Sequence, residues 1–408
     1  MGAKRKPFSI NKVGTNYSNR ADNCIAQGAL TNSKRVQSHV EGVYPTHLKK
    51  GSACYVYDEY GTRFVDYIGG LGSSVLGHSP RVVAKAISDE LNNGISLSLS
   101  STIEVECAEL LKTFFPMIDK LKFLKNGSDA CNAAIRFARA HTKRSLILTE
   151  GYHGSSDLFV SMTPPAAGIT DRFDVLPLKG NEDKMCDAAA VIVEPVNLDW
   201  SDKRIQELNK LRNDTLIFGS VLIFDEIITG MRFPGYSVSR FTGIDPDLIC
   251  LGKAIASGMP LSVVGGKKEI MDNDQVFYSM TFAGERLSLA ACMATIQEIK
   301  RLDVDTLWRN GSYFQERFNK LGDVRIEGYP TRGVFVGEPL QKALFFQECI
   351  KAGVLFGPSF FYGFMHKEHD ELTLSICNDV FNKLRMNKVK LEGKLPQSPF
   401  ATKIRGVI

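Results

Sequence analysis

Two stretches decide the fold: Val221-Leu-Ile-Phe-Asp225-Glu226 and, further along the chain, Leu248-Ile-Cys-Leu-Gly252-Lys253. Each is a short apolar run of the kind that forms a buried strand, and each ends in charged side chains. The carboxyl ends of parallel strands meet at one edge of a sheet, so a carboxylate and a lysine are expected close together there. Taken alone, the two would form an ordinary ion pair, and the rest of the sequence has to decide their role.

Similar apolar runs recur through the middle of the chain and alternate with helical patterns. The runs cover residues 121–124, 145–149, 190–194, 221–225 and 248–251, and helices are expected near 81–91, 103–115 and 130–141. Strands that alternate with helices predict an α/β fold, in which a mainly parallel sheet carries helices on both faces. A ligand of such a sheet binds beyond the carboxyl ends of its strands.

The two ends of the chain have a different character. The first fifty residues are polar, which predicts an arm, and residues 53–67 predict a β-hairpin with a turn at Asp58-Glu59-Tyr60-Gly61. A helix over 287–301, strands near Val334 and Val354 and a C-terminal helix predict a smaller α+β domain. We therefore expect an arm and hairpin over 1–75, a large domain over 76–290 and a small domain over 291–408.

Composition narrows the class of protein. The 50 basic and 45 acidic side chains are interspersed, and only Lys4-Arg5-Lys6 forms a compact basic run, so a nucleic-acid groove is not indicated. Nine cysteines without a C-x-x-C pair are typical of a reducing compartment and not of a disulfide or zinc framework. The absence of a signal-type segment and of any apolar run near ~20 residues predicts a cytosolic protein without a membrane span.

Other chemically distinctive residues stand at the ends of the expected strands. Asn126-Gly127-Ser128 precedes a helix, whose first N–H groups suit a phosphate, although the segment is equally a normal helix cap. Gly151-Tyr152-His153-Gly154 places a ring on a turn, and Glu194 ends another strand. Together with Asp225 and Lys253 they suit pyridoxal phosphate, because a lysine forms the imine and a carboxylate keeps the pyridine nitrogen protonated.

These elements, in this order, resemble the class III (subgroup II) pyridoxal-phosphate aminotransferases, and among them the glutamate-1-semialdehyde 2,1-aminomutase-like proteins. The resemblance runs from about Pro45 to Leu384. Its most specific stretches are Tyr57-Asp-Glu-Tyr-Gly-Thr-Arg-Phe-Val-Asp-Tyr67, Leu76-Gly-His-Ser-Pro80, Ile223-Phe-Asp-Glu-Ile-Ile-Thr-Gly-Met-Arg232, Pro246-Asp-Leu-Ile-Cys-Leu-Gly-Lys-Ala-Ile255 and Gly258-Met-Pro260.

The resemblance implies fold type I, with a mainly parallel seven-stranded sheet in the large domain, and a homodimer whose active site is shared. It implies that Lys253 is the Schiff-base lysine and that Asp225 binds the pyridine nitrogen. The other cofactor contacts that it implies are Gly127 and Ser128 at the phosphate, Tyr152 and Ile227 on the two ring faces, Glu194 beside the ring oxygen, and Thr281 at the phosphate of the neighbouring subunit.

The substrate side departs from the aminomutase pattern. Leu71 stands where relatives carry an aromatic ring, Tyr362 where the aminomutases carry a glutamate, and Glu285-Arg286 replaces an Asn-Pro pair. We take Leu71, Ser73, His153 and Tyr362 as candidate substrate residues, and we expect no metal site.

Three functions therefore stand. The first is an aminotransferase for a specialised small amino or keto substrate. The second is an aminomutase or a decarboxylase-type enzyme that uses the same cofactor, including the case of an amino acid attached to a nucleotide or carrier. The third is a non-catalytic binding module, which the presence of both Lys253 and Asp225 disfavours.

Overall fold

The computed structural model describes residues 15–163, 165–170 and 173–397. The described chain forms two units, one made of residues 15–80 and 309–397 and the other of residues 81–308. The basic run at residues 4–6 lies outside the described residues, and the domain bounds inferred from the sequence stay predictions. Among the described helices, none combines the length and the apolar character that crossing a membrane requires.

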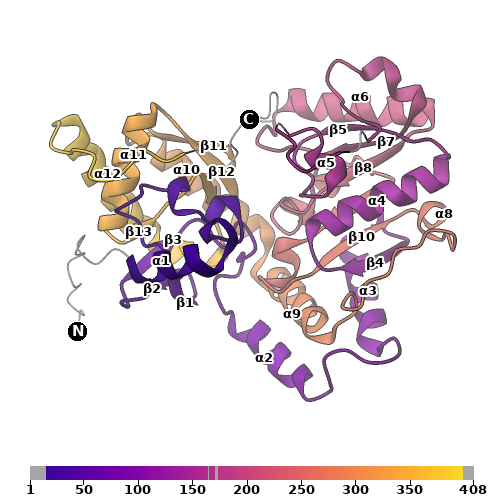
Figure 1. Ribbon diagram of the computed structural model, residues 1–408, viewed down its shortest axis with the longest axis horizontal. Coiled ribbons are helices and arrows are strands. Elements are labelled where there is room, and N and C mark those ends of the chain that lie inside the picture. The colour runs from indigo at the N-terminus through magenta and orange to yellow at the C-terminus, as the bar shows by residue number, and fades with distance from the viewer. Residues whose placement is uncertain (1–14, 164, 171–172, 398–408) are drawn as a thin grey trace. The chain divides into compact units, whose positions relative to one another are not determined.

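The centre of unit 2 is a seven-stranded sheet of order β4-β10-β9-β8-β7-β5-β6 (Figure 1). Its strands are β4 (Lys120–Leu124), β5 (Leu146–Glu150), β6 (Val175–Pro177), β7 (Ala188–Val193), β8 (Val221–Asp225), β9 (Leu248–Leu251) and β10 (Ser262–Gly266). Strand β10 is antiparallel to both neighbours, and every pair from β9 to β6 is parallel. The predicted α/β fold with a mainly parallel sheet is therefore confirmed.

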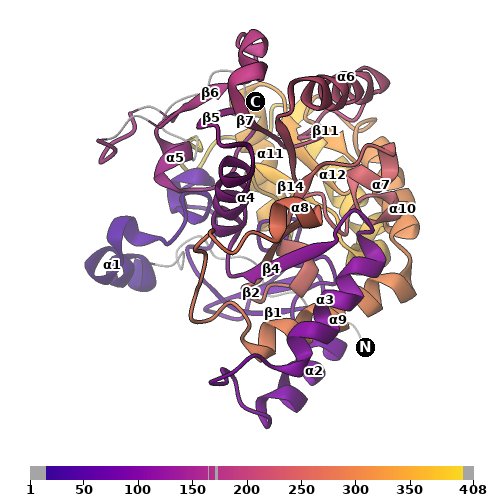
Figure 2. The ribbon, with the colours of Figure 1, turned by 90° about the vertical axis from the view of Figure 1, so that its right-hand side faces the viewer.

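Alternate residues of the central strands enter two separate cores, because successive side chains of a strand point to opposite faces. Ile223 packs in the core that contains helix α4 (Gly127–Thr142), whereas Leu222 and Phe224 pack in the core that contains α6 (Asp202–Phe218). The two helices thus cover opposite faces of the sheet (Figure 2). Burial on both faces explains why β8 is apolar at every position before Asp225.

The remaining elements of unit 2 connect and flank the sheet. They are α2 (Arg81–Leu91), α3 (Thr102–Phe114), α5 (Asp157–Val160), η5 (Glu182–Asp187), η6 (Pro234–Tyr236), α7 (Val238–Thr242), η7 (Lys253–Ala256), α8 (Lys268–Met271) and α9 (Arg286–Leu302), and α10 (Val304–Phe318) holds the boundary with unit 1. Side-chain caps fix two helix starts: Asn126 Oδ1 accepts the Asp129 N–H at 3.0 Å for α4, and Glu285 carboxylate oxygens accept the Leu287 and Ser288 N–H groups for α9.

Unit 1 contains two smaller sheets, of order β1-β2-β3-β13 and β11-β12-β14. Its elements are α1 (Thr15–Cys24), η2 (Ala26–Gly28), η3 (Asn32–Lys34), η4 (Val36–Ser38), β1 (Leu48–Ser52), β2 (Tyr55–Asp58), β3 (Arg63–Asp66), β11 (Arg325–Tyr329), β12 (Arg332–Val336), α11 (Pro339–Lys351), β13 (Val354–Leu355), β14 (Ser359–Phe361), η8 (Phe364–His369) and α12 (Asp370–Arg385). Strands β2 and β3 pair antiparallel, which confirms the predicted hairpin. The core is rich in aromatic rings, with Tyr67 stacked 5.3 Å from Phe314 and 5.5 Å from Phe360.

Candidate active site

A cavity of about 300 Å³ lies in unit 2 at the carboxyl ends of the parallel strands. Its lining consists of residues 125–128, 152–154, 194, 225, 227–228, 253 and 259–261. These include Gly127, Ser128, Tyr152, His153, Glu194, Asp225, Ile227 and Lys253, all of which the sequence had singled out. Segments that are far apart in the chain meet here because their strands end at one edge of the sheet. The geometry brings the residues together, and their roles stay proposals.

Asp225 is the buried acid at the end of β8, and its two oxygens have different surroundings. The Oδ2 atom accepts hydrogen bonds from His153 Nδ1 at 2.8 Å and from the Cys131 thiol at 3.4 Å. Within the described chain, Oδ1 accepts only the N–H of Ile227, at 3.1 Å. A carboxylate oxygen can accept two hydrogen bonds, so Oδ1 keeps one position for a donor in the cavity.

His153 forms a buried ion pair with Asp225. Burial alone would lower the pKa of the imidazole, but the hydrogen bonds with Asp225 and Cys131 outweigh it and raise the pKa of His153 to about 10. The ring is therefore cationic at neutral pH, and its 2.8 Å hydrogen bond to Asp225 Oδ2 is charge-assisted. In the described chain, the Nε2 atom of His153 has no hydrogen-bond partner.

His153, Asp225 and Cys131 are also residue types that bind metals, and their donor atoms lie within 4.8 Å of one another. The 2.8 Å contact between Nδ1 and Oδ2 is a direct hydrogen bond, so a cation has no room between these two atoms. A protonated imidazole is moreover not a ligand. The arrangement favours an ion pair that holds Asp225 over a metal site.

The second acid of the pair at the strand end, Glu226, has a structural environment. It is fully buried, and its carboxylate accepts the Val238 and Ser239 N–H groups at 2.8 and 3.0 Å and the Thr229 hydroxyl at 2.9 Å. Burial raises the pKa of Glu226 to about 7 despite these donors. Only Asp225 of the two acids lines the cavity.

Three segments form a closely packed cradle at the start of α4. Ser128 Oγ accepts the Ser155 N–H at 2.9 Å, and a Cβ atom at Gly154 would lie only 2.2 Å from that Oγ. A Cβ at Gly127 would lie 2.6 Å from Ile227 Cδ1. Glycine is therefore required at position 154, where φ is +104° and the backbone Cα of Ser128 would lie only 2.7 Å from a Cβ, whereas at position 127 a side chain would have to displace the tip of Ile227. The N-terminus of a helix such as α4 suits an anion.

Lys253 follows β9 after the single residue Gly252 and lines the same cavity. Its backbone has a φ angle of +46°, a left-handed conformation that non-glycine residues rarely adopt. Such strain concentrates at functional sites, where the surrounding structure holds it in place. In the same lining, Glu194 Oε1 accepts the backbone N–H of Tyr152 at 2.7 Å, and Tyr152 is 48% exposed.

These residues fit pyridoxal phosphate. The glycine-lined start of α4 suits the phosphate, the accepting position on Asp225 Oδ1 suits the pyridine N–H, and Lys253 supplies the amine. Ile227 and Tyr152 line the same cavity.

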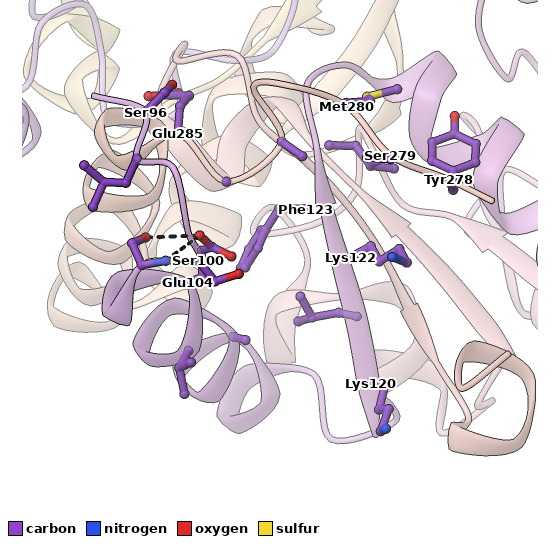
Figure 3. A pocket seen from close by; sticks show the side chains of 18 of the residues that line it. Ser96, Ser100, Glu104, Lys120, Lys122, Phe123, Tyr278, Ser279, Met280 and Glu285 are labelled. Carbon is purple, nitrogen blue, oxygen red and sulfur yellow. Dashed lines mark hydrogen bonds between the residues drawn. The ribbon is translucent and has the colours of Figure 1, made fainter. Parts of the chain in front are cut away.

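Four of the residues predicted from the sequence lie outside this cavity. Thr281 lines a second and larger cavity of about 730 Å³, shown in Figure 3, between the start of α3, strand β4 and residues 278–285. Leu71, Ser73 and Tyr362 belong to unit 1, where the Tyr362 ring is fully buried and its hydroxyl donates to both oxygens of Asp370 at 2.9 Å. The bond to Asp370 gives Tyr362 a structural role, and the ion pair with Asp225 gives His153 one. The substrate roles of Leu71, Ser73, His153 and Tyr362 stay predictions.

The comparison with protein families agrees with this geometry. The family model "Aminotransferase class-III" matches residues 36–181 and 175–360. The chain belongs to the class-III aminotransferases. Pyridoxal phosphate is the cofactor of this family and of this chain.

Among its curated relatives are glutamate-1-semialdehyde 2,1-aminomutases. That of Thermodesulfovibrio yellowstonii is 31% identical over 396 residues, which cover 84% of this chain and 93% of the relative. That of Fusobacterium nucleatum is 35% identical over 302 residues, which cover 68% and 70%. The predicted resemblance is thus confirmed.

Solved structures of this class share the fold. The FumI protein of Sphingopyxis sp. MTA144, in its pyridoxal-phosphate form, matches with a TM-score of 0.85 at 24% identity, covering 93% of this chain and 98% of FumI. The ornithine aminotransferase of Toxoplasma gondii ME49 matches with a TM-score of 0.75 at 18% identity, covering 92% and 100%. At these identities the likeness establishes the fold, including the fold type I arrangement.

Two residues of this cavity and its surroundings were not predicted from the sequence. Cys131 on α4 donates to Asp225, and Lys125 stands one residue before the Asn126 cap and lines the cavity. A small residue inside an apolar helix carries no signal of such a contact. Lys125 could have been noticed as a charge adjoining the phosphate turn, but its partners lie 135 to 163 residues away.

Proposed function

We propose that the protein is a pyridoxal-phosphate-dependent aminotransferase for a specialised small amino or keto substrate, in which Lys253 and Asp225 carry the chemistry. The observation that supports it best is the meeting of Lys253, Asp225 and the glycine-lined start of α4 around one cavity. An ion pair needs no such cradle, whereas a phosphorylated pyridine needs all three.

When bound, pyridoxal phosphate supplies a carbonyl that condenses with amines and a ring that accepts the electrons released when the substrate carbon loses a proton. Lys253 would hold the cofactor and then move a proton to and from the substrate carbon. Asp225 would keep the ring nitrogen protonated, while His153 and Cys131 orient Asp225. Gly127 and Ser128 would bind the phosphate, Tyr152 and Ile227 would enclose the ring, and Glu194 would lie beside its oxygen.

Aminomutase chemistry is the second candidate, because the two relatives described above, at 31% and 35% identity, are named as aminomutases. The two reactions differ in where the nitrogen goes. With a substrate carrying ¹⁵N, a transferase moves the label to a different acceptor molecule, whereas a mutase returns it to another carbon of the same skeleton. Mass spectrometry of the products separates them, and loss of CO₂ would reveal the decarboxylase variant, including one on a nucleotide- or carrier-linked amino acid.

We further propose that two copies form a homodimer with shared sites. Around the cavity that Thr281 lines, unit 2 exposes several large apolar side chains, among them Leu97 (51% exposed), Leu99 (86%) and Phe282 (60%). Exposed apolar groups that gather in one place mark interaction surfaces. A cytosolic location is proposed with it, because all nine cysteines are free thiols.

The Schiff-base role of Lys253 has a direct test. Borohydride reduction of the cofactor-loaded protein should attach a pyridoxyl group to Lys253, and the peptide that carries it is identified by mass spectrometry. Lys253→Ala should lose the attachment and all turnover and still fold, because truncation at the rim of a cavity costs little stability. Lys203→Ala, on the exposed surface of α6, is the matched control. Undiminished turnover in Lys253→Ala would sink the proposal.

A further inference from the structure

Lys125 lies between strand β4 and the phosphate turn, and its ammonium group is fully engaged. The Nζ atom donates to Glu285 Oε1 at 2.8 Å, to the Pro260 carbonyl at 3.0 Å and to Ser288 Oγ at 3.4 Å. An ammonium has three donor hydrogens, so these three acceptors leave none for a ligand in the cavity. Lys125 therefore lines the cavity without a donor to offer to its contents.

The three acceptors belong to segments that the proposed cofactor site uses. Pro260 follows the loop that begins with Lys253, and it lines the cavity. Glu285 and Ser288 begin helix α9, directly after the segment that carries Thr281. One ammonium group thus joins the phosphate turn to the lysine loop and to the Thr281 segment.

The carboxylate of Glu285 also has several hydrogen-bond partners. It is 11% exposed, and its oxygens also accept the Leu287 and Ser288 N–H groups at 2.9 and 3.1 Å. Burial would raise the pKa of Glu285, but the hydrogen bonds with Lys125 and Ser288 overcome it and the pKa is lowered. The acid is thus a charged, fixed acceptor that fastens the end of the Thr281 segment.

The other end of this segment is fastened to the same region of the chain. The Tyr278 hydroxyl donates to the Asp129 carbonyl at 2.9 Å, and Arg136 donates to the Phe277 carbonyl at 2.7 Å. Figure 3 shows Tyr278, Ser279 and Met280 along one part of the larger cavity and Glu285 at another. The two anchors lie on either side of the phosphate turn in the sequence, one at Lys125 and the other on α4.

We propose that Lys125 is a positioning residue, which fastens the Thr281 segment to its own subunit through the ion pair with Glu285 and so holds Thr281 in place for the phosphate site of the other subunit. This rests on the proposed shared site, in which Thr281 completes the phosphate site of a second copy of the chain. Two other roles compete: Lys125 could stabilise the fold alone, or it could act on the cofactor phosphate independently of Thr281. Both differ from the proposal in their consequences.

The first experiment removes the ion pair without leaving a charge unpaired. The double variant Lys125→Met/Glu285→Gln keeps an oxygen for the α9 cap, and its affinity for pyridoxal phosphate is titrated by absorbance near ~420 nm alongside its thermal midpoint. We expect affinity to fall by roughly three- to a hundredfold, at most the loss caused by Thr281→Val. The thermal midpoint should stay close to that of the wild type. Lys210→Met, which breaks an ion pair on the surface of α6, should leave both unchanged.

The second experiment tests whether the effect passes through Thr281. In a Thr281→Val background the double variant should cause no further loss of affinity, because the hydroxyl that Lys125 positions is already absent. Additive losses, or an unchanged affinity in the double variant, would overturn the positioning role. If Thr281→Val alone leaves affinity intact, the shared site fails and this inference with it, whereas a failed cofactor attachment at Lys253 would overturn the proposed function. Glu285→Gln alone repeats the test if the double variant does not fold.

Discussion

At the scale of single residues, hydrogen bonds hold the Asp225 carboxylate in one orientation toward the cavity. Its Oδ2 atom is occupied by His153 and Cys131, and its Oδ1 atom keeps an accepting position toward the cavity. The carboxylate is therefore oriented before any ligand arrives. Preorganised charge of this kind is usually the largest contribution to catalysis.

Asp225→Asn tests this arrangement, because it keeps the shape of the side chain and removes its charge. Cofactor should still bind, but deprotonation of the substrate should slow by ~10²–10³-fold or more, the loss of about 3–4 kcal/mol of electrostatic stabilisation. Single-turnover kinetics with deuterated substrate measures the step. Asp245→Asn, an exposed acid that binds the Ser239 hydroxyl, is the control, and a near-normal rate in Asp225→Asn would place the electron-sink partner elsewhere.

At the scale of elements, η8 contains a buried histidine, His366, that must stay neutral. The Gly363 N–H donates to His366 Nδ1 at 2.8 Å, so Nε2 carries the proton and donates to the Asp66 carbonyl at 2.8 Å. Protonation of Nδ1 would remove the acceptor for Gly363. Burial lowers the pKa of His366 to about 4, well below its ordinary 6.5.

Because the pKa of His366 is lowered in the folded chain, the free energy of unfolding should fall as the pH falls. Below pH 6.5 the unfolded chain binds a proton at residue 366 that the folded chain does not, so stability is lost as the pH falls toward 4. Between pH 7 and 5 this single group should cost roughly 2 kcal/mol. His366→Gln, which can still accept and donate, should show a smaller fall in thermal midpoint over this range. Equal falls in the two proteins would contradict the assignment.

At the scale of the whole molecule, the placement of Thr281 bears on assembly. It lines a different cavity from Lys253, although both residues are expected at one cofactor. A shared site reconciles the two, since Thr281 would then serve the neighbouring subunit of a two-fold dimer. Cofactor affinity should therefore depend on dimerisation.

The variant Thr281→Val tests whether the cofactor site is shared between two subunits. Loss of one hydrogen bond to a charged oxygen costs about 1.5–3 kcal/mol, so cofactor affinity should fall roughly ten- to a hundredfold. Sedimentation combined with cofactor titration checks both assembly and binding. Thr113→Val, an exposed threonine whose hydroxyl donates to the Leu110 carbonyl in α3, is the matched control. A monomer that binds pyridoxal phosphate at full strength would refute the shared site.

The sequence by itself determined the architecture and most of the cavity lining. Apolar runs and helical periodicity are local signals, so β8, β9 and the β2–β3 hairpin lie where they were predicted. Residues at strand ends are brought to one edge by the parallel sheet alone, which is why Asp225, Lys253 and Gly127 could be placed together in advance. The resemblance to the class-III family named their expected roles.

Only the tertiary structure decided how these groups are held. It turned Glu226 toward the N–H groups of α7 and left Asp225 at the cavity, and it placed His153 and Cys131 on Asp225. The ion pair between Lys125 and Glu285 joins positions 160 residues apart in the chain. Such contacts depend on the packing of segments from several elements and leave no periodicity in the sequence, so the fold had to be complete before they could be recognised.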